Sequence, residues 1–219
     1  MTADRRQRLR AHLPALMLLI DGSRADAEIA AAVDGGVNML QARAPEASTV
    51  RLADLASDAR AIAAGRALVL VHGDVDAALW AEADGVHLPE AAWTARLARV
   101  RAGAGGALLI SCAVHGVEAA RRADAEGADL IVAGTVFPSA SHPGGATIGI
   151  DGLREICAAV RIPVIAIGGV TAANAGEVMQ AGASGAAVIG AIRGAPDALP
   201  AAEALRAAID AGFRRQNAP

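Results

Sequence analysis

Short apolar runs recur along the whole chain, and an Ala-rich segment of helical period follows most of them. This alternation predicts a parallel sheet with helices between consecutive strands. The predicted strands are Leu16 to Asp21, Val37 to Arg43, Ala67 to Gly73, Gly85 to Pro89, Leu108 to Val114, Leu130 to Val136, Pro163 to Gly169 and Gly185 to Ile192. The predicted helices include Asp26 to Asp34, Ser48 to Ala64, Val117 to Glu126 and Asn174 to Ala181.

Eight strands in 219 residues leave roughly 27 residues for each strand and its helix, which suits a short (β/α)8 barrel. We therefore expect an α/β protein with a single-domain (β/α)8 TIM barrel. An open, doubly wound sheet is the alternative, but it ordinarily carries a G-x-G-x-x-G turn after its first strand, and "IDGSRAD" has none. The expected boundaries are an arginine-rich extension or helix over residues 1–15 and the barrel over residues 16–219.

Composition narrows the classes of partner. The chain is 54% hydrophobic, enough for one sizeable core, and its formal net charge of -3 does not indicate a nucleic-acid or anionic-membrane surface. No apolar run approaches the roughly 18 residues of a membrane span. The two cysteines, Cys112 and Cys157, lack metal-ligand spacing, which favours reduced thiols. We expect a cytoplasmic protein that binds a small molecule, with neither nucleic acid nor membrane as a partner.

In a (β/α)8 barrel the ligand site lies at the carboxyl ends of the strands. The predicted strand ends carry polar groups, followed after strand six by the loop "VFPSASHPGG"; these groups are Asp21, Gln41, Arg43, His72, His87 and His115. Gly168, Gly169 and Gly190 follow strand seven or end strand eight. Glycines allow backbone N–H groups to approach a phosphate, so we expect either a phosphate site or simply tight turns there. All twenty basic residues are arginine, which excludes Schiff-base chemistry on a lysine.

Several longer motifs occur in a fixed order. They are "LQAR" at strand two, "ADGVHLP" around strand four, "SCAVHGVEAA" at strand five, "GTVFPSASHPGG" after strand six and "IPVIAIGGVTAANAGEVMQAGASGAAVIGAI" through strands seven and eight. In these motifs, from Leu16 to Ile192, the chain resembles the thiamine phosphate synthase and TenI superfamily. The resemblance implies a TIM barrel, a thiazole phosphate ligand and a role in thiamine biosynthesis.

Synthases of this superfamily join a pyrimidine diphosphate to a thiazole phosphate. They bind Mg²⁺ through an Asn-Asp pair after strand three and an Asp after strand four, because Mg²⁺ prefers carboxylate oxygens. The resemblance aligns His72 and Gly73 with the Asn-Asp pair and Ala92 with the last Asp. Asp74 and Glu90 would replace these ligands only in a shifted register.

Basic groups of the synthases are also missing. Pro45 and His142 stand at the positions of two lysines, and Ser139 and Ser141 stand at those of two threonines. A departing diphosphate needs positive charge near it, and the chain offers less of it than the synthases do.

TenI-like members keep the barrel and the thiazole phosphate site but lack the diphosphate machinery. Those that act as thiazole tautomerases use a histidine at strand five as general acid/base, and His115 matches it, although Ala113 replaces a nearby serine. A proton shift needs a group that titrates near neutrality and no metal. We therefore expect a TenI-like thiazole tautomerase, an isomerase without a cofactor.

The resemblance also implies roles for particular residues. His115 would transfer the proton. Gln41 and Arg43 would hold a substrate carboxylate, since a guanidinium pairs with it through two hydrogen bonds, unless Arg43 forms a salt bridge inside the barrel. The further substrate-binding residues would be His72, Ser139, Ser141 and His142, and the backbone groups that bind the phosphate would be those of Gly168, Gly169, Ile189 and Gly190. We expect no residue to bind a metal.

Two alternatives remain open at this point. One is a thiamine phosphate synthase that uses Mg²⁺, and the other is a non-catalytic protein that binds thiazole phosphate. A homodimer is expected only as a property of the family, and the sequence leaves open whether Arg5 to Arg10 form a helix that closes the barrel.

Overall fold

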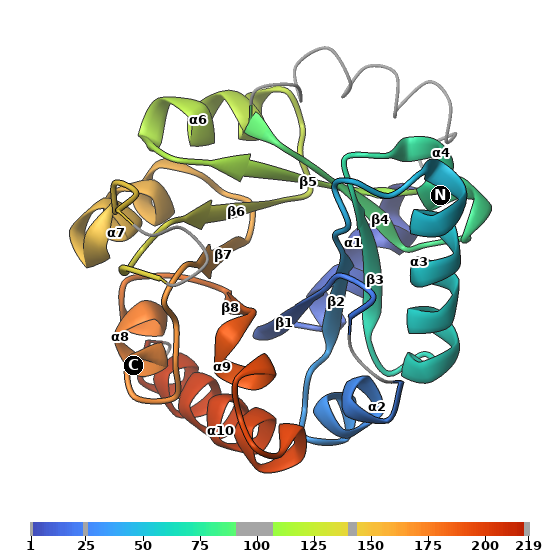
Figure 1. The fold of residues 1–219 in the computed structure, drawn as a ribbon. Coiled ribbons are helices and arrows are strands. Elements are labelled where there is room, and N and C mark those ends of the chain that lie inside the picture. Colours follow the sequence, from blue (N-terminus) through green and yellow to red (C-terminus); the bar gives the residue numbers. More distant parts are fainter. Residues whose placement is uncertain (1, 24–25, 91–106, 140–143, 217–219) are drawn as a thin grey trace.

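Eight parallel strands form a closed barrel, with helices around it (Figure 1). The computed structural model describes residues 2–23, 26–90, 107–139 and 144–216. Each strand pairs with the next along the chain, and β8 pairs with β1 to close the sheet. The strands are β1 (Ala15–Ile20), β2 (Met39–Ala42), β3 (Leu68–His72), β4 (Gly85–Leu88), β5 (Leu109–Val114), β6 (Leu130–Gly134), β7 (Val164–Ile167) and β8 (Gly185–Val188). The predicted TIM barrel is confirmed, and the open sheet is excluded.

Helices follow most of the strands and cover the outside of the barrel, while α1 precedes β1 (Figure 1). They are α1 (Thr2–Ala11), α2 (Asp26–Asp34), α3 (Thr49–Ala63), α4 (Val75–Trp80), α6 (Val117–Ala125), α7 (Gly149–Ala159), α8 (Ala175–Gln180), α9 (Gly190–Arg193) and α10 (Ala198–Gln216). The long α10 packs against both α2 and α8, so the last helix closes the outer ring beside the first strand. None of the described helices is long and apolar enough to cross a membrane.

Alternation along each strand divides the apolar residues into two cores. Side chains that point outward pack against the helices and form the larger core. Those that point inward fill the barrel and include Met17, Met39, Leu70, Leu109 and Ile165. Because inward positions recur every second residue, the inward row of each strand continues towards its carboxyl end, where polar residues replace the apolar ones.

The helix α1 covers the amino ends of the strands. Leu9 of α1 is 2% exposed and belongs to the inner core. Arg5 and Arg6 each bind the carboxylate of Asp129, which lies just before β6, through their Nε atoms at 3.1 Å and 2.9 Å. The same buried carboxylate accepts the backbone N–H of Ile110 at 3.0 Å. An ion-pair network and one apolar anchor therefore hold α1 against the end of the barrel that is opposite the predicted site.

Several predicted strands are longer than the observed ones, and the largest difference is at the end of β8. The strand predicted over Gly185 to Ile192 ends at Val188, and the short helix α9 begins at Gly190. The backbone N–H of Arg193 bonds back to the carbonyl of Ile189 at 2.9 Å, so this apolar segment turns away from the sheet. A short apolar run does not distinguish a strand from a helix by periodicity.

Candidate functional site

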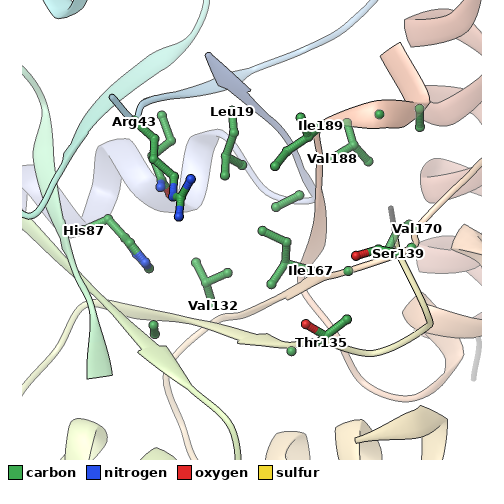
Figure 2. A pocket seen from close by; sticks show the side chains of 18 of the residues that line it. Leu19, Arg43, His87, Val132, Thr135, Ser139, Ile167, Val170, Val188 and Ile189 are labelled. Atoms are coloured by element: carbon green, nitrogen blue, oxygen red, sulfur yellow. The ribbon is translucent and has the colours of Figure 1, made fainter. Parts of the chain in front are cut away.

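A cavity of 520 Å³ opens at the carboxyl end of the barrel. Every predicted site residue that the structure describes lines it, and these residues are Gln41, Arg43, His72, His115, Ser139, Gly168, Gly169, Ile189 and Gly190. Ser141 and His142 lie outside the described residues. Figure 2 shows Arg43 and His87 on one side of the cavity and Ile189, Val170 and Ser139 on the opposite side.

The two sides of the cavity differ in chemistry. The side formed by β2 to β5 carries Gln41, Arg43, His72, His87 and His115. The side formed by β6 to β8 carries mainly glycines and apolar residues, with the hydroxyls of Thr135, Ser139 and Thr171. A ligand that spans the cavity therefore meets charged and imidazole groups at one end and exposed backbone at the other.

Strand register brings the histidines together. His72 on β3 is the register partner of His87 on β4, and His87 is the register partner of Ser111 on β5. All three occupy inward positions, so their side chains form one layer inside the barrel. The rings of His72 and His87 lie 5.4 Å apart between centroids, and Nδ1 of His87 lies 2.8 Å from Oγ of Ser111.

Burial decides the charge of His87. The residue is 5% exposed, and Ser111 is fully buried. Desolvation, with added repulsion from His72 and Arg43, lowers the pKa of His87 to about 3. His87 is therefore neutral near pH 7 and offers the cavity a hydrogen-bonding ring without a charge.

Arg43 supplies a permanent positive charge to the cavity. It stands just past β2, at the next inward position after Gln41. No carboxylate of the described residues lies within salt-bridge distance of Arg43, so the alternative of a salt bridge inside the barrel finds no support there. Beside it, Nε2 of Gln41 lies 3.3 Å from Nδ1 of His72.

His115 lies at the rim rather than inside the barrel. Its Nδ1 contacts Oε2 of Glu90, which follows β4, the neighbouring strand. The side chain of His115 is 67% exposed, and that of Glu90 is 31% exposed. His115 lines the cavity, and Glu90 is not among the lining residues.

Close packing explains two of the glycines. Gly168 and Gly169 have φ values of +103° and +64°. A Cβ on Gly168 would lie 2.4 Å from Cγ2 of Thr135, and one on Gly169 would lie 2.6 Å from the carbonyl oxygen of Pro138. Asn174 holds the same turn, because its Nδ2 donates to the carbonyl of Gly169 at 3.0 Å and its Oδ1 accepts from the N–H of Thr171 at 2.8 Å.

Gly190 is different, since a Cβ there would meet no atom within 4 Å. It begins α9, and the first N–H groups of a helix have no partner within the helix. At the end of α9, Arg193 donates from Nη1 to Oδ2 of Asp21 at 2.8 Å. Burial opposes ionisation of Asp21, but hydrogen bonds from Ser23 and the charge of Arg193 lower its pKa below the ordinary value.

Sequence reasoning missed three polar groups of this region: Ser111, Thr135 and Thr171. A period-two count from Leu109 would have placed Ser111 on the inward row of β5. Thr171 follows the "AIGGV" glycines directly, and Thr135 follows β6 directly, so their positions at strand ends were a usable signal.

The carboxylates near the cavity already have protein partners. Asp74 caps α4 by accepting the N–H of Ala77 at 3.0 Å, and it accepts the hydroxyl of Thr49 at 2.8 Å. Glu90 is held by His115, and Asp21 by Arg193. Within the described parts of the chain, no three His, Cys, Asp or Glu side chains are grouped so that they could hold a metal ion.

Comparison with known proteins assigns the family. The family model for thiamine monophosphate synthase matches residues 18–192, most of the chain. The chain belongs to the thiamine monophosphate synthase family. The thiamine-phosphate synthase of Chloroflexus aurantiacus is 39% identical over 185 residues, which are 84% of each chain. That of Pyrococcus abyssi is 38% identical over 82% of this chain and 86% of its own length.

A solved structure extends the similarity to three dimensions. The thiamine phosphate pyrophosphorylase of Pyrococcus furiosus superposes with a TM-score of 0.83 and 33% identity, over 95% of this chain and 98% of its own. This relative is thus similar to the chain in both sequence and backbone.

These comparisons correct the predicted activity. The expectation of a TenI-like thiazole tautomerase, and of an isomerase, is wrong, because the two relatives above, each aligned over more than 80% of this chain, carry the name of a synthase, which is a transferase. The prediction relied on a few missing charged residues, whereas the similarity to synthases extends over most of the chain.

Proposed function

We propose that this protein is a transferase that joins a pyrimidine diphosphate to a thiazole phosphate. The observation that carries the proposal is the two-sided cavity, with Arg43 and the imidazoles on one side and the backbone around Gly190 on the other. A reaction between two phosphorylated rings needs one site for each anion. The similarity to relatives named thiamine-phosphate synthase supports the same function.

The reaction requires little from the protein beyond orientation and charge. The thiazole nitrogen attacks the methylene carbon of the pyrimidine, the carbon–oxygen bond breaks, and the diphosphate leaves with the electron pair. Arg43 faces the developing charge with a guanidinium that stays protonated. His87 contributes a neutral ring, and backbone N–H groups at Ile189, Gly190, Gly168 and Gly169 hold the thiazole phosphate away from Arg43.

The described residues do not fit a preformed Mg²⁺ site. Magnesium in such enzymes binds one or two carboxylates together with substrate phosphates. Here the carboxylates of Asp21, Asp74 and Glu90 are held by protein groups. The sequence of residues 91–106 adds no Asp, Glu, His or Cys. We therefore assign no step of the reaction to a metal.

The test is an assay for both products. The purified chain is incubated with the pyrimidine diphosphate and the thiazole phosphate, with Mg²⁺ or with EDTA, and thiamine phosphate and pyrophosphate are quantified. We expect the native protein to form thiamine phosphate and pyrophosphate in equal amounts. Arg43→Ala should lower kcat/KM roughly 100-fold, because it removes one charged donor. Arg154→Ala is the control, because Arg154 pairs only with exposed Asp151 among the described residues. Tight binding of the thiazole phosphate without product would overturn the proposal in favour of a binding protein.

A further inference from the structure

Glu90 has no place in the mechanism above, yet it makes a specific contact. Its Oε2 faces Nδ1 of His115, and the two residues come from the ends of neighbouring strands, 25 positions apart in the chain. A carboxylate has no hydrogen to donate, so Nδ1 must carry the proton in this contact. The second ring nitrogen, Nε2, is then left to interact elsewhere.

The cavity lies beside His115. His115 lines the cavity, but Glu90 does not. A carboxylate that bonds to one ring nitrogen of a histidine fixes the tautomer and the orientation of the ring. His115 stands just past β5 and Arg43 just past β2, on the side of the cavity that carries the cationic and imidazole groups.

We propose that Glu90 is a positioning residue, which holds His115 with Nδ1 protonated and presents Nε2 to the departing diphosphate. This inference rests on the proposed synthase reaction. In the protonated state, Nε2–H donates a charge-assisted hydrogen bond to a phosphate oxygen. Glu90 keeps the ring in place for that bond.

Two variants separate this role from a general charge effect. Glu90→Ala removes the carboxylate behind His115. Glu118→Ala removes the same charge three residues after His115, from an exposed side chain that pairs with Arg121 at 3.0 Å. Both positions lie at the surface rather than in the core, so both variants are expected to fold.

The first measurement does not depend on activity. Long-range proton–nitrogen NMR spectra report which ring nitrogen of His115 carries the proton when the ring is neutral. We expect the Nδ1–H form in the native protein and in Glu118→Ala, and a shift towards the Nε2–H form in Glu90→Ala. An Nε2–H form in the native protein, or an unchanged tautomer in Glu90→Ala, would overturn the inference.

The second measurement tests the consequence for the reaction. We expect Glu90→Ala to lower kcat about tenfold and to change either KM less than about twofold, since the bond forms mainly as the diphosphate departs. His115→Ala should lose at least as much, and the double variant should lose no more than His115→Ala alone, because the two residues act as one unit. Additive losses would contradict the positioning role. Absence of product in the native protein would defeat the proposed function, whereas the NMR result would still decide how Glu90 and His115 interact.

Discussion

Nδ1 of His87 lies 2.8 Å from Oγ of Ser111, inside the barrel and below the cavity. Both side chains are buried, and they come from register partners on adjacent strands. His87 therefore contributes both to packing within the barrel and to the lining of the cavity.

The buried imidazole makes stability depend on pH. The pKa of His87 is about 3 in the folded protein, against about 6.5 in an unfolded chain. As pH falls below 6.5, the unfolded chain binds a proton that the folded protein does not, so the contribution of His87 to stability is present above that pH and is lost towards pH 3. We expect a slope of up to about 1.4 kcal/mol per pH unit from this group.

Urea unfolding between pH 7.5 and pH 4.5 measures this effect. His87→Asn should show a flatter decline with acidity than the native protein. Parallel profiles for the native protein and His87→Asn would show that His87 does not titrate as its burial requires.

Substitution by alanine should affect stability differently at two glycines on the phosphate side of the cavity. Gly168→Ala places a methyl group 2.4 Å from Thr135 at a φ of +103°, so we expect a loss of about 2–4 kcal/mol in the free energy of unfolding. Gly190→Ala meets no atom within 4 Å, so stability should change by less than about 1 kcal/mol. The added methyl group would instead enter ligand space and raise KM for the thiazole phosphate. Unchanged KM in Gly190→Ala would place the phosphate elsewhere.

The ion-pair network at the amino end should be costly to break. Asp129→Asn removes the charge that Arg5 and Arg6 share, and the carboxylate is fully buried. We expect a loss of about 3 kcal/mol or more in urea unfolding and faster proteolysis within α1. Asp151→Asn, in an exposed pair with Arg154, should cost no more than about 0.5 kcal/mol. Equal effects of the two substitutions would refute a structural role for the network.

The two thiols should react slowly. Burial raises the pKa of Cys157 to about 11, and Cys112 is fully buried. Only the thiolate attacks a disulfide reagent, so labelling of the folded protein at pH 8 should be slow and should accelerate about tenfold per pH unit up to pH 10. Both thiols should react at once in 8 M urea, while rapid labelling of the folded protein would show that Cys157 is more accessible than described.

Periodicity predicted the barrel because the strands, and most of the helices, show their pattern of apolar residues within a short stretch of sequence. The helix predicted over Asp26 to Asp34 has those bounds in the structure, and Ser48 caps α3 by accepting the N–H of Arg51. The same reasoning failed at Ile189 to Ile192, where an apolar run turns into α9. Local pattern alone does not say where a short apolar segment leaves the sheet.

The site was predictable in position but not in its contacts. Strand ends located Gln41, Arg43, His72 and the glycines, because every parallel strand of a barrel delivers its carboxyl end to one face. The contact between Glu90 and His115 depends on two strands being neighbours, and the neutrality of His87 depends on burial. Neither is visible in a single segment.

The location of the Asp129 network has a consequence for how such a barrel can change. Arg5, Arg6 and Asp129 secure the fold at one end, and the cavity occupies the other. An exposed position near the cavity end, such as Pro45, can therefore vary with little risk to folding. A barrel arranged in this way can change the charges around its ligands while the ion pairs at its amino end stay the same.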